Sequence, residues 1–176
     1  HFNIENHTKR DDTGLFTDGV NTPNDLPGLW TVGAQYSILP SLRVMASTHY
    51  YFDKDARMAN DKQKHLTHNT REYLAGVEWD ITKDILVSCG GQITDYGLGD
   101  GTAINDLSFV TSSRSFGFGA KFSVAKNMKV NVAYFFTDYK HLKKNYTEDI
   151  QRLKVECSDD FTRTNKVLGV GVDIDF

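Results

Sequence analysis

In several segments of this sequence, polar and apolar residues alternate. The charged residues at the polar positions of these segments are the first candidates for chemistry. Arg43 and Glu78 share the polar parity of two such segments, and Asp80 follows Glu78 on that parity. Acids and bases are mixed within the set, so pairing between neighbouring strands would satisfy their charges. We favour this structural interpretation over contact with a plug or with a substrate carboxylate. The full set is Arg43, Glu78, Asp80, Lys121, Lys129 and Asp173.

Ser47, His49 and Tyr51 alternate along one segment and raise the question of hydrolysis. A hydrolase needs its serine and histidine within hydrogen-bond reach and a third group that orients the histidine. No strained nucleophile turn marks this segment. We therefore predict that the protein is not an enzyme.

Other reactive residues are sparse or poorly spaced. His65 and His68 stand in a polar segment and are too few for a metal site. Cys89 lies in an alternating segment and Cys157 in a long polar one, so we expect no disulfide between them. The glycines near position 90 and at 97–101 lack the strand-to-helix context of a phosphate loop. We predict no metal and no cofactor.

A strict two-residue period predicts the elements that hold these residues. Apolar residues take one parity and polar residues the other, which is typical of a strand with unlike faces. Short turns such as Leu39-Pro40-Ser41 separate neighbouring segments, because proline cannot donate to a strand ladder. The predicted strands cover residues 29–38, 42–53, 72–81, 85–94, 116–124, 128–137 and 167–176.

The connections between these strands are alternately very short and long. The long polar connections span about residues 54–69, 95–112 and 138–164. Strands of about ten residues suit a tilted crossing of a bilayer, and short turns on one side with long loops on the other are typical of outer-membrane barrels. We predict an all-β fold, an antiparallel transmembrane β-barrel with about seven strands in this chain. A soluble barrel is the alternative.

Aromatic residues of the apolar parity favour the membrane, because they fall into two bands, as at lipid interfaces. A soluble core does not predict two bands. The band near the long loops contains Trp30, Tyr50, Phe52, Tyr73, Tyr134 and Phe136, and the band near the short turns contains Tyr36, Trp79, Phe122 and Phe176.

Composition excludes several other classes. The 176 residues are 39% hydrophobic and 12% aromatic, which argues against disorder. The formal net charge of −3 gives no basic footprint for nucleic acid. No apolar run is long enough for a transmembrane helix.

The final nine residues, LGVGVDIDF, resemble the C-terminal signal of Gram-negative outer-membrane proteins. The resemblance implies recognition by the barrel-assembly machinery and a multi-pass location in the cell outer membrane. Its apolar positions are Leu168, Val170, Val172, Ile174 and Phe176.

A narrower resemblance covers residues 30–176. The runs WTVGAQY at 30–36, LPSLRV at 39–44, YLAGVEW at 73–79 and FGFGAKF at 116–122 resemble later strands of the FadL/TodX family. That family carries long-chain fatty acids and other hydrophobic compounds across the outer membrane. Its members are 14-stranded barrels with an N-terminal hatch. The resemblance implies that this chain is the C-terminal portion of such a barrel.

The number of strands also bears on whether this chain is part of a larger barrel. Bacterial single-chain barrels have an even number of strands, whereas about seven are predicted here. We predict that residues 1–27 are an extracellular loop segment, that residues 28–176 supply barrel strands, and that the N-terminal half of the barrel is missing. A strand hidden near Phe2 and Ile4 is the alternative.

Apolar residues in the otherwise polar N-terminal segment are the predicted ligand contacts. In FadL-type proteins outer loops form an apolar groove that captures ligand, and the resemblance assigns this role to Leu15, Phe16 and Val20. Packing of the segment onto the barrel rim is the alternative. The leading hypothesis is thus a channel for hydrophobic small molecules, with membrane lipid and this ligand as partners. A small structural or adhesion barrel, or a secretion-accessory barrel of the same family, is the alternative.

Overall fold

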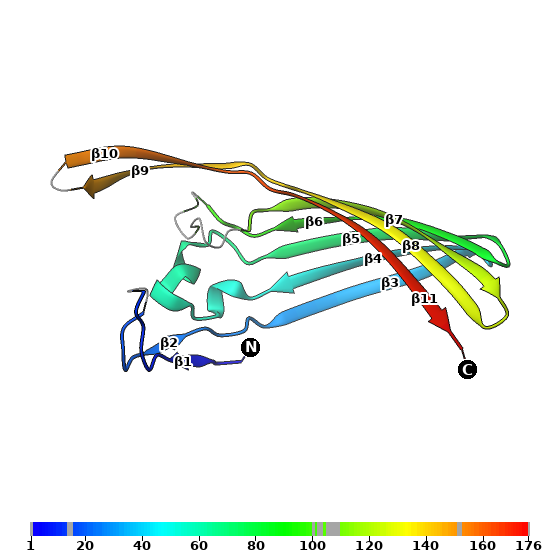
Figure 1. The fold of residues 1–176 in the computed structure, drawn as a ribbon, viewed down its shortest axis with the longest axis horizontal. Coiled ribbons are helices and arrows are strands. Elements are labelled where there is room, and N and C mark those ends of the chain that lie inside the picture. Colours follow the sequence, from blue (N-terminus) through cyan, green and yellow to red (C-terminus); the bar gives the residue numbers. More distant parts are fainter. Residues whose placement is uncertain are drawn as a thin grey trace.

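The computed structural model describes residues 2–13, 16–99, 101, 104, 110–150 and 153–175. Within these ranges the chain forms one seven-stranded antiparallel sheet, here called the main sheet, and two separate two-stranded sheets (Figure 1). The predicted all-β fold is therefore confirmed. The strands of the main sheet are β3 (Leu29–Leu39), β4 (Leu42–Tyr51), β5 (Arg71–Thr82), β6 (Ile85–Asp95), β7 (Ser113–Ala125), β8 (Met128–Tyr139) and β11 (Thr164–Ile174).

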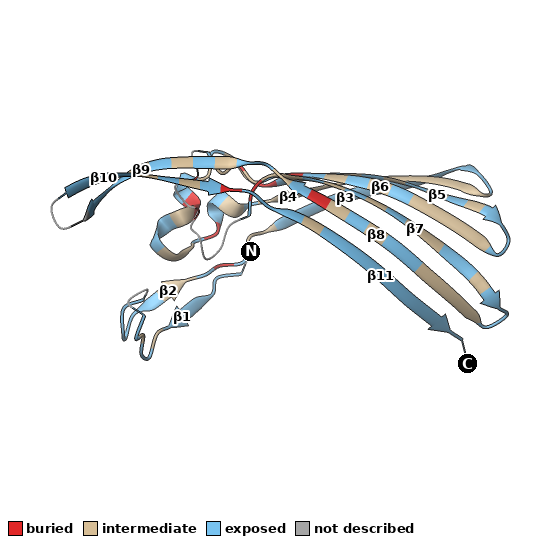
Figure 2. Cartoon of the chain, turned by 45° about the horizontal axis from the view of Figure 1, so that its top comes forward, coloured by how far each residue is buried: buried red, intermediate tan, exposed pale blue. Residues whose placement is uncertain are grey.

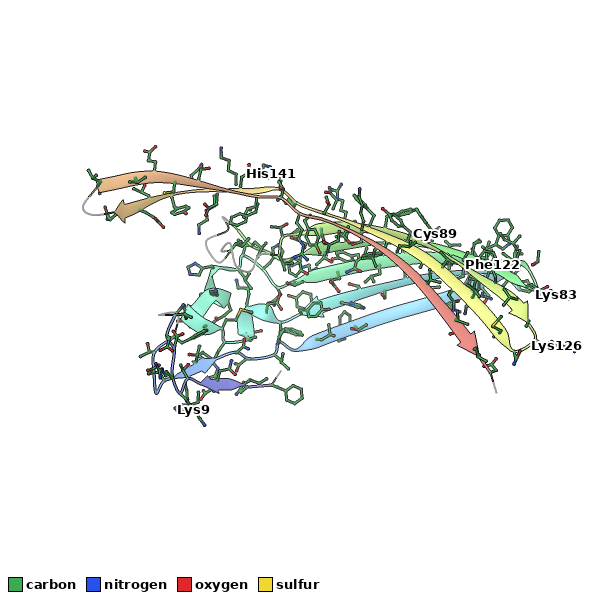
Figure 3. The ribbon with its side chains drawn as sticks, viewed as in Figure 1. Lys9, Lys83, Cys89, Phe122, Lys126 and His141 are labelled. Carbon is green, nitrogen blue, oxygen red and sulfur yellow. The ribbon has the colours of Figure 1, made fainter. Side chains whose placement is uncertain are left out.

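Neighbours in the main sheet follow the chain, in the order β11-β8-β7-β6-β5-β4-β3. Short turns join β3 to β4, β5 to β6 and β7 to β8 at one end, where Lys83 and Lys126 lie (Figure 3). The long connections all lie at the other end (Figure 1). The predicted alternation of short and long connections is confirmed.

The strand register gives the main sheet two unlike faces. Ala120, Val132 and Val170 are cross-strand partners on the first, which we call the apolar face. Arg43 and Glu78 are partners on the second, which we call the polar face. Because side chains alternate along a strand, every predicted strand places its apolar parity on the same side. The predicted division of residues between two faces is confirmed.

The main sheet is open. Strands β3 and β11 form its edges, and the described residues do not close it into a barrel. Every residue of β3 is exposed, as are nearly all residues of β11 (Figure 2). Each edge therefore presents an unpaired row of backbone N–H and C=O groups.

The segment 138–164 corrects the prediction of a long polar loop. It forms a hairpin of β9 (Leu142–Ile150) and β10 (Leu153–Phe161) that extends beyond the main sheet (Figure 1). Its cross-strand partners include Lys143 with Asp160 and Lys144 with Asp159. Opposite charges stabilise such pairs, but they give no apolar period for sequence reading to detect.

The remaining elements are small. Residues 1–27 contain a hairpin of β1 (Glu5–His7) and β2 (Asn21–Pro23). Between β4 and β5 stand two 3-10 turns, η1 (Asp53–Asp55) and η2 (Ala59–His65). In the described ranges the buried hydrophobic residues are Ala56, Ile104 and Phe161, all outside the main sheet. No hydrophobic core of described residues covers either face of the main sheet.

Candidate functional site

The polar face carries a charge cluster near the short turns. The Arg43 guanidinium donates from Nε to Glu78 Oε2 at 3.2 Å and from Nη1 to Asp80 Oδ2 at 2.8 Å. Arg43 and Glu78 are direct cross-strand partners, and Asp80 lies two residues further along β5. The predicted pairing of Arg43 with an acid on the neighbouring strand is confirmed, and Asp80 is a second partner.

The other predicted charges lie on the same face but pair less completely. Asp173 accepts a hydrogen bond from Asn131 Nδ2 at 2.9 Å. Lys121 is the cross-strand partner of Asn131, and Lys129 is the partner of Asp173. The ion pairs among described residues include neither lysine. The ion pairing that was predicted for this set is thus present at Arg43, and for Lys121 and Lys129 it stays a prediction.

A second polar cluster lies on the same face near the long connections, and its centre is the Glu72 carboxylate. His49 Nδ1 lies 2.9 Å from Glu72 Oε2, and the Tyr51 hydroxyl donates to the same oxygen at 3.2 Å. Gln92 Nε2 and the Thr94 hydroxyl each donate to Oε1 at 3.1 Å. The Glu72 side chain is only 13% exposed, so these bonds replace most of its contact with water. We call these five residues the Glu72 cluster.

The Glu72 cluster bears on the hydrolase question. Glu72 orients His49, as a third catalytic group would, but Ser47 is not its hydrogen-bond partner. In the part of the chain that the structure describes, no serine, threonine or cysteine bonds to the His49 ring. The arrangement supplies an oriented histidine without an activated nucleophile. The absence of enzymatic activity stays a prediction.

Three glycines form the floor of a groove between the two clusters. Gly76, Gly90 and Gly117 are successive cross-strand partners on β5, β6 and β7. Met45 continues the row on β4 and Phe135 on β8. Since glycine has no side chain, the polar face is hollowed here into a groove of about 780 Å³. That volume lies within the range of about 300–1,000 Å³ that is usual for small-molecule sites.

Close packing explains why glycine occupies this row. A Cβ at Gly90 would lie 2.9 Å from the carbonyl oxygen of Ala75, and one at Gly117 would lie 3.1 Å from the Phe135 ring. At Gly76 the nearest atoms would be 3.4 Å away, which is ordinary contact. Two of the three positions therefore exclude a side chain unless neighbours move.

The groove offers mainly apolar surface and bare backbone, with polar groups at its two ends. Glu78 of the charge cluster and Gln92 of the Glu72 cluster both line it. Such a groove can hold the apolar body of a ligand and position a polar group at either end. Sequence reasoning placed these glycines in strands but missed the floor, because the row exists only through the pairing of β5, β6 and β7.

The predicted ligand contacts in the N-terminal segment lie apart from this groove. Phe16 and Val20 are 50% and 47% exposed, and none of the described residues lining the groove comes from their segment. Leu15 lies outside the described residues. The capture role of these three residues stays a prediction.

The described residues of the predicted C-terminal assembly signal lie on one face of β11, and the role of this segment in assembly stays a prediction. Leu168, Val170, Val172 and Ile174 share the apolar face, and Leu168 and Val170 are 72% and 70% exposed. Phe176 lies outside the described residues. Contiguous exposed apolar surface is typical of protein–protein or membrane interaction sites.

A buried carboxylate attaches the N-terminal segment to the turn before η2. The Asp25 side chain is fully buried, and its two oxygens accept bonds from Arg57 Nε at 2.9 Å and Nη2 at 3.2 Å. The backbone N–H of Ile4 donates to Asp25 at 2.9 Å, and that of Arg57 does so at 3.1 Å. Chiefly through the Arg57 side-chain bonds, the pKa of Asp25 falls from 3.8 to about 2.

This attachment should depend on pH. A carboxylate with a lowered pKa stabilises the folded form above its unfolded pKa, and the effect is lost as pH falls through the folded pKa. We expect residues 2–26 to resist pepsin at pH 4 and to become progressively more sensitive between about pH 4 and pH 2. Asp25→Asn should be sensitive throughout. Asp12→Asn is the control, since Asp12 pairs with Arg10 on an exposed surface; an identical profile for both variants would contradict the assignment.

Other site types receive no support in the described ranges. No group of three or more histidine, cysteine, aspartate or glutamate side chains could hold a metal there. Cys89 and Cys157 are both free, in agreement with the prediction. Nor does any described helix have the length and apolarity to cross a membrane. A scan of family models and a search of curated proteins found no match for this chain. The FadL/TodX resemblance therefore stays a prediction.

Proposed function

We propose that this chain supplies strands to an outer-membrane β-barrel that conducts hydrophobic small molecules, such as long-chain fatty acids, as in the FadL/TodX family. The exposed apolar face of the main sheet carries the proposal. Large apolar side chains such as Trp30, Tyr73 and Leu168 are more than half exposed there. Lipid acyl chains would cover this face without a protein core.

Strand length and connectivity support the same placement. The main-sheet strands are 10–13 residues long, which is sufficient for a tilted crossing of the hydrocarbon layer. The short turns at one end and long connections at the other match the usual asymmetry of outer-membrane barrels.

The open edges support the participation of further strands. Strands β3 and β11 run in the same direction, because the sheet between them is antiparallel with seven members. Each edge needs an antiparallel neighbour, and an odd number of additional strands would close the barrel with an even total. In a bilayer such closure is required, since lipid cannot satisfy backbone groups. The barrel-assembly machinery would act on the complete set.

The groove on the polar face supplies a passage for an apolar ligand. It lies midway between the charge cluster and the Glu72 cluster, and glycine leaves it open. A ligand moving along the inside of the barrel would meet apolar surface here and polar groups before and after it.

The β9–β10 hairpin favours one other function, that of an adhesion barrel. It extends beyond the main sheet, and charged residues cover much of it (Figure 1). An extended polar hairpin outside the cell could bind a partner. Deletion of the hairpin would abolish adhesion but leave transport intact, which separates the two functions.

A bulky side chain in the groove tests the channel. Gly76→Trp should lower the rate of oleate uptake by the full-length protein by about tenfold, equivalent to about 1.4 kcal/mol. The variant should still fold, because a Cβ at Gly76 meets no atom closer than 3.4 Å. Uptake by cells that express each variant at matched levels is the measurement.

Gly169→Trp is the matched control. Gly169 also lies on the polar face, but it does not line the groove, and a Cβ there would meet only the Ala133 carbonyl at 4.0 Å. Uptake should stay at the level of the unmodified protein. Equal uptake by the two variants, with both inserted in the outer membrane, would contradict the channel.

A further inference from the structure

Charged residues occur on the apolar face at one end only. Each of them occupies the last or next-to-last apolar-face position of its strand, at the end where the long connections lie. Between this end and the short turns, the described main-sheet strands place apolar, small or uncharged residues on this face. The charged residues are Arg71, Asp95, Arg114, Asp138 and Lys166.

Arg114 on β7 and Lys166 on β11 are the two bases of this set that flank β8. Both are exposed, and neither belongs to an ion pair of the described residues. Lys166 is the partner of Phe136, and Arg114 is the partner of Asp138, two residues further along β8. Two strand spacings and two residues separate their Cα atoms by about 12 Å, so two long side chains can converge on one group.

The acids of the set are placed differently. Asp95 is held by His68 Nε2 at 3.2 Å and by the Ser112 hydroxyl at 3.0 Å. Asp138 is exposed beside Arg114 and makes no ion pair with it. An anionic ligand would therefore share both bases with Asp138, which is the direct partner of Arg114 and the diagonal neighbour of Lys166 on β8.

An apolar stripe begins directly beside these two bases. The rings of Phe116 and Phe118 meet edge to face at 5.4 Å, and Phe118 stacks on Tyr134 at 5.7 Å. Leu168 is the partner of Tyr134 and is 72% exposed. The stripe runs from the charged end toward the middle of the strands and presents a surface for an acyl chain.

We propose that Arg114 and Lys166 bind the phosphate of a phosphorylated outer-leaflet lipid, whose acyl chains lie along Phe116, Phe118 and Leu168. This inference rests on the membrane placement in the proposed function, but not on transport. The forked guanidinium of Arg114 can donate two parallel bonds to phosphate oxygens, and the Lys166 ammonium adds a point charge. The two parts of the surface thus match the two parts of one amphipathic anion.

Titration of the full-length protein in detergent with diphosphoryl lipid A, followed by native mass spectrometry, tests this site. A basic residue at a membrane surface raises affinity for anionic lipid about fivefold, so Arg114→Gln or Lys166→Gln should weaken binding by about that factor and the double variant by about thirtyfold. Asp138→Asn should tighten binding. Lys126→Gln removes the same charge at the opposite end of the β7–β8 hairpin and should change nothing (Figure 3).

Three results would overturn the proposal. One is equal affinity for lipid A with and without its phosphates. Another is an equal loss in Lys126→Gln and the double variant, which would indicate unspecific electrostatics. The third is displacement of the lipid by millimolar inorganic phosphate, which would indicate a free-anion site.

Separate measurements distinguish this failure from failure of the proposed function. The double variant should take up oleate normally, and Gly76→Trp should bind lipid A normally. Flotation of the unmodified protein with vesicles tests membrane placement itself. Loss of flotation would overturn both proposals, whereas loss of phosphate selectivity alone would overturn only this one.

Discussion

Replacement of Val132 by arginine should destabilise the protein folded in a bilayer by about 2–4 kcal/mol. Val132 lies at the middle of β8 on the apolar face, between Ala120 and Val170 of the neighbouring strands. At the midplane an arginine side chain there would have no water and no acid within reach. Urea titration of the full-length protein in dilauroylphosphatidylcholine vesicles gives the measurement.

Asn131→Arg is the matched control, because it places the same side chain one residue away on the opposite face. Asn131 already donates to Asp173, so an arginine at this position gains an acidic partner. The control should change stability by no more than about 0.5 kcal/mol. Equal losses in the two variants would mean that both faces see the same solvent, and the apolar face would then belong to a soluble protein.

The two faces were predictable because strand alternation is a local property. Neighbouring residues such as Asn131 and Val132 differ in polarity, so the face of each can be predicted from one strand alone. The short turns then determine which strands are neighbours. Register followed from the same information, since the turns between β3 and β4 or β5 and β6 leave little freedom. This is why the pairing of Arg43 with Glu78 could be predicted.

Features built from several strands were not predictable in the same way. The Glu72 cluster joins residues of β4, β5 and β6, and the glycine floor needs the registers of β5, β6 and β7 together. A signal was present, since Gly76, Gly90 and Gly117 all fall on the polar parity where larger polar residues are expected. The β9–β10 hairpin was missed for another reason, because charged residues fall on both parities of its strands and its opposite charges meet only across the strand pair.

The glycine floor itself offers no side-chain contacts that could keep neighbouring strands in register. Glycine contributes no side-chain contact across strands, so nothing on the polar face holds β5, β6 and β7 in register along that row. A slip of one residue would exchange the two faces. The Glu72 cluster on one side joins β4, β5 and β6, and the charge cluster on the other side joins β4 and β5. Both add specific contacts to the registers of these three strands. For β4, β5 and β6, the polar clusters beside the floor therefore reinforce the register that the short turns favour.

Glu72→Ala should consequently lower the free energy of unfolding by about 2–4 kcal/mol, the other large effect expected for this chain. The substitution leaves His49, Tyr51, Gln92 and Thr94 without their common acceptor in a half-buried site. Hydrogen bonds to a charged group contribute more than neutral ones, and the four donors lose theirs together. Unfolding of the full-length protein in urea, followed by tryptophan fluorescence, gives the magnitude.

Two further variants separate loss of the cluster from loss of a charge. Glu72→Gln keeps one carbonyl oxygen for Gln92 and Thr94 and should lose about half as much stability as Glu72→Ala. Glu156→Ala removes an equal charge from an exposed position of β10 and should fall within about 0.5 kcal/mol of the unmodified protein. If Glu72→Ala were as stable as Glu156→Ala, the register of β4, β5 and β6 would not depend on the Glu72 carboxylate, and the glycine floor would have to be held by backbone pairing alone.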